Sequence, residues 1–115
     1  MLQQELMVLG QYVAYTGEDV PVREEPPRPG RPSTLYHGHP GRITDPMQEH
    51  IIADWVGIED TPFSWANGFS VTYRGGPCPG LAPLTEQEYE LRKDRIARGL
   101  HPFTGANAVE GSPGQ

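Results

Sequence analysis

The sequence predicts a small, irregular α+β domain built from an N-terminal strand, a β-hairpin and two helices. Three observations support this prediction. Helix-start signals stand before the segments at about 46–56 and 86–98, and an Asn-Gly pair between strand-forming residues indicates a hairpin at about 62–74. The other segments are rich in proline and glycine, and we expect them to form extended arms.

The first helix is predicted to begin directly after Asp45. The Asp45 carboxylate can accept a hydrogen bond from the open amide of Gln48, and Pro46 is tolerated at a first helical position because the missing N–H had no partner there. Apolar side chains then recur at helical spacing and form one stripe, namely Met47, Ile51, Ile52 and Trp55. These signals together predict a helix over about 46–56.

The hairpin is predicted to turn at Asn67-Gly68, because both positions of a tight turn need positive φ and these two residues adopt it most readily. Large aromatic side chains then leave both faces of the hairpin, which an isolated hairpin cannot bury. We therefore expect Phe63, Trp65 and Tyr73 to contact a partner.

The second helix carries its own start signal, a capping box formed by Thr85 and Glu88. Acidic residues fill its first turns and basic residues its last turns, as the helix dipole favours. The spacing also predicts two ion pairs four residues apart, Glu88–Arg92 and Asp94–Arg98. We expect this helix over about 86–98.

Composition divides the 115 residues into four parts. Tyr12, Val13 and Tyr15 favour a strand near the N-terminus. Gly and Pro together make 27 residues, and they are concentrated between the predicted elements. The predicted parts are an N-terminal strand of the core at 1–16, a Pro-rich extended arm at 17–42, a compact helix–hairpin–helix core at 43–103 and a flexible tail at 104–115.

Charge and hydropathy exclude several classes of protein. The net charge of −6 is spread along the chain, which disfavours non-specific binding to nucleic acid or to an anionic membrane. No apolar run is long enough to span a membrane, and the N-terminus lacks the basic start of a signal peptide. We expect a soluble protein that is cytoplasmic or virion-associated.

The Pro-rich segment contains a candidate recognition motif. Residues 26–32 hold two overlapping Pro-x-x-Pro spacings beside arginine, a pattern typical of ligands for proline-binding domains. Gly30-Arg31-Pro32 also resembles the end of an AT-hook, but Pro29 stands where that family has arginine, so nucleic acid is not the expected partner. The residues predicted to contact a protein partner here are Pro27, Arg28, Pro29 and Arg31, together with Phe103 near the C-terminus.

Several histidines are candidate metal ligands. His37 and His39 lie two residues apart, so an extended backbone would place both on one side. Cys78 and His101 are further candidate zinc ligands, but none of these spacings matches a known ligand pattern. We therefore predict no metal, no cofactor and no enzymatic activity, and keep a zinc site as an alternative.

The sequence favours a non-enzymatic interaction or assembly protein. A modest folded centre with long arms suits a small accessory or structural subunit of the virion-accessory type, which docks on a larger complex through its arms and aromatic hairpin. A protein partner or a homo-oligomer is expected. The alternatives are a small inhibitor of a soluble host or cellular protein, and a small zinc-binding protein or enzyme that uses His37, His39, Cys78 and His101.

Overall fold

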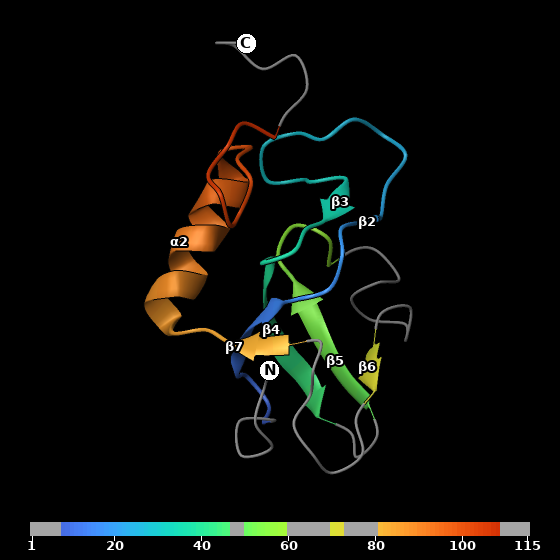
Figure 1. Cartoon of the computed structure of the whole chain (residues 1–115), viewed down its shortest axis with the longest axis vertical. Helices are drawn as coiled ribbons and strands as arrows, with labels where there is room; N and C mark the ends of the chain where they lie inside the picture. The colour runs from blue at the N-terminus through green and yellow to red at the C-terminus, as the bar shows by residue number, and fades with distance from the viewer. Residues whose placement is uncertain (1–7, 47–49, 60–69, 73–80, 109–115) are drawn as a thin grey trace.

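The computed structural model describes residues 8–46, 50–59, 70–72 and 81–108 (Figure 1). These ranges form seven strands and one helix, which confirms the predicted α+β class. In chain order the elements are β1 (Tyr12–Tyr15), β2 (Val20–Pro21), β3 (Thr34–Leu35), β4 (Pro40–Pro46), β5 (His50–Trp55), β6 (Ser70–Thr72), β7 (Leu81–Pro83) and α2 (Glu86–Ala97).

Five strands form one antiparallel sheet in the order β6-β5-β4-β1-β7, and β2 pairs with β3 in a separate two-stranded sheet. The predicted N-terminal strand is present as β1, where Val13 pairs with Gly41 of β4 on one side and with Pro83 of β7 on the other. The pairing continues beyond β1, because the Gly10 N–H donates to the Ile43 carbonyl at 2.8 Å. Segments far apart in the sequence therefore lie side by side in the sheet.

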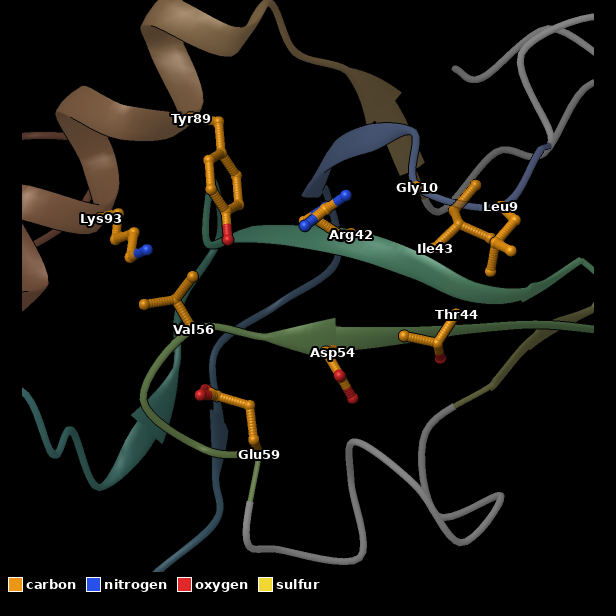
Figure 2. Close-up of a pocket in the computed structure, with 10 residues that line it drawn as sticks. All are labelled: Leu9, Gly10, Arg42, Ile43, Thr44, Asp54, Val56, Glu59, Tyr89 and Lys93. Atoms are coloured by element: carbon orange, nitrogen blue, oxygen red, sulfur yellow. The ribbon is translucent and has the colours of Figure 1, made fainter.

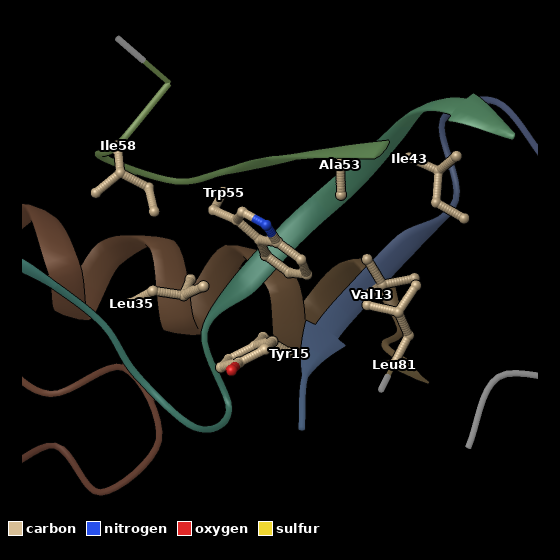
Figure 3. Close-up of a cluster of buried hydrophobic side chains, with 8 residues drawn as sticks. All are labelled: Val13, Tyr15, Leu35, Ile43, Ala53, Trp55, Ile58 and Leu81. Atoms are coloured by element: carbon tan, nitrogen blue, oxygen red, sulfur yellow. The ribbon is translucent and has the colours of Figure 1, made fainter. Parts of the chain in front are cut away.

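One face of the sheet carries the hydrophobic core (Figure 3). Successive side chains of a strand point to opposite faces, so β1, β4 and β5 each send alternate residues inward. The rings of Tyr15 and Trp55 meet edge to face, with centroids 5.9 Å apart. The core consists of Val13, Tyr15, Leu35, Ile43, Ala53, Trp55, Ile58 and Leu81, with Val20 and Val22 of the β2–β3 region packed against it.

Glycine at position 41 allows the largest core side chain to cross β4. A Cβ atom at Gly41 would lie 2.5 Å from Cε3 of Trp55 and 2.7 Å from the Asp54 carbonyl oxygen. Both distances are shorter than real contacts of a Cβ atom, so the indole can lie against β4 only because this position has no side chain.

Helix α2 follows its local sequence signals. The Thr85 hydroxyl accepts from the Glu88 N–H at 3.1 Å, as the capping box predicts. Both predicted ion pairs are present, Glu88–Arg92 at 3.2 Å and Asp94–Arg98 at 3.0 Å. The helix ends at Ala97, one residue before the predicted end. Its buried residues are Tyr89 and Ile96, and in Figure 1 it runs beside the sheet.

The predicted helix over 46–56 is wrong, because His50–Trp55 forms the strand β5. Asp45 and Pro46 do not cap a helix but end β4, where they pair with Ile52 and Ile51. The apolar residues of this segment fit a two-residue period as well as a helical one, and the strand buries Ala53 and Trp55 on the core face. Pairing with β4 and β6 therefore outweighs the local helix signals.

The Pro-rich segment is folded back on the rest of the protein. Arg28-Pro29-Gly30-Arg31 makes a tight turn in which Gly30 has φ +77°, as a type II turn with proline in its second position requires. The Gly30 N–H donates to the Ile96 carbonyl of α2 at 2.8 Å, and Leu35 and His39 are fully buried. These residues therefore do not form the extended arm expected at 17–42. The division of the chain into four parts stays a prediction.

The Asn67-Gly68 turn lies outside the described residues, so the hairpin at 62–74 stays a prediction. Its described part, β6, is a strand whose partner is β5, with Val71 opposite Ile51. Within the described part of the chain, no helix has the length and apolar character needed to cross a membrane.

The contact between Gly41 and Trp55 makes a test of the core. We expect Gly41→Ala to lower the free energy of unfolding by about 2 kcal/mol, because the added methyl group overpacks the indole and the β5 backbone. Urea unfolding of the two proteins measures this difference. Gly30→Asn is the control, since nothing lies within 4 Å of a Cβ atom there and asparagine tolerates positive φ. Equal losses in both variants would contradict the packing described here.

Candidate binding cleft

The outward face of the sheet is partly covered by α2 and partly open, and a cleft of about 360 Å³ lies at the boundary (Figure 2). Strands β4 and β5 form its floor, and the Tyr89 and Lys93 side chains of α2 border it. Its lining residues are Leu9, Gly10, Arg42, Ile43, Thr44, Asp54, Val56, Glu59, Tyr89 and Lys93.

Two tyrosine rings lie between two cations beside this cleft. The rings of Tyr12 and Tyr89 have centroids 4.4 Å apart. The Arg42 guanidinium carbon lies 5.2 Å from the Tyr12 centroid, and Lys93 Nζ lies 5.9 Å from the Tyr89 centroid. We call these four residues the cation–tyrosine stack. Such contacts hold a cation in place while leaving most of its N–H groups able to donate.

The stack is assembled from three elements by simple geometry. Arg42 is the cross-strand partner of Tyr12, so both side chains emerge on the same face of the sheet. Tyr89 and Lys93 lie four residues apart on α2 and therefore share one face of the helix. Burial raises the pKa of Tyr89, with Arg42 acting in the opposite direction, so the phenol keeps its proton and remains a hydrogen-bond donor.

The opposite side of the cleft is acidic. Asp54 lies across from Arg42 in the pairing of β4 with β5, and burial raises the pKa of its carboxyl group. Glu59 follows the turn after β5, and its Oε1 accepts from the Ile58 N–H at 3.1 Å. Figure 2 shows both carboxylates below β5, while Arg42 and Lys93 lie on the side of β4 and α2. The cleft therefore has a cationic side and an acidic side.

The mouth of the cleft combines bare backbone with apolar side chains. Gly10 has φ +86°, and a Cβ atom there would lie 3.4 Å from Arg42 Nη2, so the guanidinium rests close to the glycine backbone. Next to it, the side chain of Leu9 is 72% exposed and that of Val8 is 50% exposed. Large exposed apolar groups beside fixed charges are typical of surfaces that contact another molecule.

The residues predicted from sequence to bind a partner lie elsewhere or outside the described residues. Phe63, Trp65 and Tyr73 fall outside, so their prediction is not tested. Three others, Arg28, Pro29 and Arg31, belong to the turn that contacts the end of α2, and Pro27 directly precedes it. Arg31 is paired there with Glu25 at 2.8 Å. That turn is not the continuous polyproline helix that a proline-binding domain recognises. The predicted contact of Pro27, Arg28, Pro29 and Arg31 with a partner stays a prediction.

Phe103 is half exposed and contributes to a second aromatic surface. The Arg92 guanidinium carbon lies 5.0 Å from its ring centroid, and the ring of His37 meets it edge to face at 6.0 Å. Arg95 holds this loop by donating to the carbonyls of Pro102 and Phe103 at 3.2 and 3.0 Å. The predicted contact of Phe103 with a partner stays a prediction.

Three histidines of the zinc alternative lie in the described part of the chain. One of them, His39, has both ring nitrogens in hydrogen bonds. His39 is 0% exposed, its Nε2 donates to the Val56 carbonyl at 2.7 Å, and its Nδ1 accepts from the Tyr36 N–H at 3.3 Å. Neither ring nitrogen is left for a metal. Among the described residues, no three His, Cys, Asp or Glu side chains are grouped to hold a metal ion. Cys78 lies outside those residues.

The other two histidines are engaged through Nδ1. That of His101 accepts from the N–H groups of Phe103 and Thr104, at 3.1 and 3.2 Å. That of His37 lies 3.1 Å from the Thr16 carbonyl oxygen, to which it can only donate. The ring of His101 also contacts that of Tyr36, with centroids 4.4 Å apart and the planes tilted by 50°. These contacts give the histidines a structural role in joining the loops around residues 16, 36 and 101.

The sequence does not single out the cation–tyrosine stack. It predicts Tyr12 in a strand, and Tyr89 and Lys93 on a helix, but it places Arg42 at the end of an arm. The grouping depends on the pairing of β1 with β4 and on the docking of α2. No motif or regular spacing links these positions, so only the three-dimensional arrangement identifies them.

The buried His39 makes stability depend on pH. Burial lowers the pKa of His39 from 6.5 to about 4. Between these two pH values the unfolded chain therefore binds a proton at His39 and the folded chain does not. We expect stability to fall as pH decreases through this window, by roughly 3 kcal/mol in all for this group. Urea unfolding at several pH values measures the loss.

His39→Gln should flatten the pH dependence, because it removes the titrating ring, although the variant starts from a lower stability. His37→Gln is the matched control at an exposed histidine and should keep the pH dependence of the original chain. Parallel curves for His39→Gln and the original chain would show that His39 does not cause the loss.

Comparisons with protein-family models, with curated proteins and with solved structures found no match to this chain. The function must therefore follow from the geometry and chemistry of its own residues.

Proposed function

We propose that this chain is a non-enzymatic interaction or assembly protein, a small accessory subunit that docks on a larger complex. The observation that carries the proposal is the cation–tyrosine stack, which holds two cations at an open cleft. The docking surface of this proposal is the cleft together with the exposed Leu9 and Val8 at its mouth.

The composition of this surface supports docking. Tyrosine and arginine are enriched at the centres of protein interfaces, where they combine a large rigid contact area with directed hydrogen bonds. Tyr12, Tyr89 and Arg42 already hold one another in fixed positions, so little conformational entropy remains to be lost on binding. An exposed leucine beside them adds apolar area.

The groups of the cleft are better suited to holding a ligand than to reacting with it. The Arg42 guanidinium and the Lys93 ammonium are hydrogen-bond donors, and burial raises the pKa of Tyr89, which favours its protonated form. Fixed donors of this kind orient a carboxylate or carbonyl group of a partner. We therefore place the interaction site at the cleft.

A photo-crosslinking amino acid at position 9 tests the proposal in an extract of the protein's own source. We expect it to cross-link one recurrent protein, because Leu9 is exposed at the mouth of the cleft. The same group at position 98, on an exposed side chain of α2's C-terminal end, is the control and should give weaker or unrelated products.

Native mass spectrometry of the captured complex then gives its stoichiometry. A fixed ratio within a large assembly supports the accessory-subunit proposal, and a one-to-one complex with a soluble enzyme favours the inhibitor alternative. A chain that stays monomeric in the extract, with equal labelling from positions 9 and 98, would refute docking through this surface.

A further inference from the structure

We infer that the cleft recognises a single carboxylate side chain, aspartate or glutamate, on an apolar segment of the partner protein. Arg42 would bind the carboxylate directly, Lys93 on the other side of Tyr89 would add electrostatic attraction, and Leu9 would contact the adjacent apolar side chain. This inference rests on the proposed function and specifies the chemistry of the docking partner.

The charge distribution supports an anionic ligand at this position. Most other cations of the described residues are already paired: Arg23 and Arg31 with Glu25, Arg92 with Glu88, and Arg98 with Asp94. Within the same part of the chain, Arg42 and Lys93 have no ion pair and contact tyrosine faces instead. An incoming carboxylate could therefore bind them without breaking an existing ion pair.

The geometry of the cleft also favours a side chain of modest size. Each cation lies over one tyrosine ring, and the Tyr89 hydroxyl points toward β4 between Arg42 and Lys93 (Figure 2). A guanidinium, an ammonium and a phenol together offer donors of the kind that a carboxylate accepts. A volume of about 360 Å³ fits a few residues of a peptide.

The acidic side of the cleft disfavours a ligand with more than one negative charge. Asp54 and Glu59 face the cations across the cleft and would repel a phosphate dianion or a nucleic-acid backbone. The overall charge of −6 opposes polyanions as well. The same two carboxylates can accept backbone N–H groups from a peptide bound along β5. A protein segment with one carboxylate therefore suits both sides of the cleft: its carboxylate is attracted to the cations, and its backbone N–H groups can donate to Asp54 and Glu59.

Selection of random dodecapeptides displayed on phage, with the full-length chain immobilised, tests this inference and does not require the partner to be identified first. We expect the enriched peptides to share one Asp or Glu next to a large apolar residue. Fluorescence anisotropy of labelled synthetic copies then gives their affinities for the original chain and for the variants.

Arg42→Glu and Lys93→Glu should each weaken binding roughly tenfold or more, because each replaces an attractive contact with a repulsive one. Arg28→Glu is the matched control, with the same change in net charge at an exposed arginine of the Pro-rich turn, and should change affinity less than about twofold. Changing the peptide's acidic residue to its amide should weaken binding to the original chain, and much less to Arg42→Gln. Circular dichroism of each variant checks that the fold is retained.

Several results would overturn the inference. Enrichment of basic peptides, no enrichment, or equal losses with Arg28→Glu and Arg42→Glu would each refute a carboxylate site in the cleft. Tighter binding after replacement of the acidic residue by phosphoserine would assign the site to phosphate. Light scattering that shows a dimer lost in Arg42→Glu would identify a second copy as the occupant. If position 9 still cross-links a partner after any of these results, the proposed function stands and only the carboxylate assignment fails.

Discussion

The contact between Trp55 and Gly41 is the constraint on which the rest of the structure depends. The indole fills the core only because β4 presents a residue without a side chain at the crossing point. That contact fixes the register of β5 on β4, and β4 in turn aligns β1. A shift of one residue would turn the inward side chains outward, so the register decides the identity of both faces of the sheet.

The same register also builds the cleft. Because alternate residues of β4 point to opposite faces, burying Ile43 on the core side necessarily places Arg42 on the outer side. There Arg42 meets Tyr12 from β1, and Tyr89 of α2 packs on that ring. The core and the candidate site are therefore two faces of one set of strand pairings, and a perturbation of Trp55 would also move the cations.

Sequence patterns predict the elements whose structure is decided by short-range signals. Thr85 caps α2 as expected, and the ion pairs along this helix form, because all their partners lie within four residues. The segment around Trp55 is predicted as a helix because Asp45 and Pro46 resemble a helix start. In the structure this segment is β5, which pairs with β4 on one side and β6 on the other. Patterns within a single sequence do not show which strands will pair. The cation–tyrosine stack escapes prediction for the same reason, since Arg42 and Tyr89 are brought together by tertiary packing alone.

The strand order also affects how the chain can fold. Val13 of β1 pairs with both Gly41 and Pro83, so this part of the sheet closes only after segments far apart in sequence have met. Closing such long loops costs chain entropy before any packing is gained. Folding should accordingly be slower than that of a helical bundle of this length, and β1 should remain unpaired on its β7 side until residues 81–83 have emerged during synthesis. Through that interval a strand destined for the core exposes a free edge, which makes the nascent chain a natural substrate for molecular chaperones.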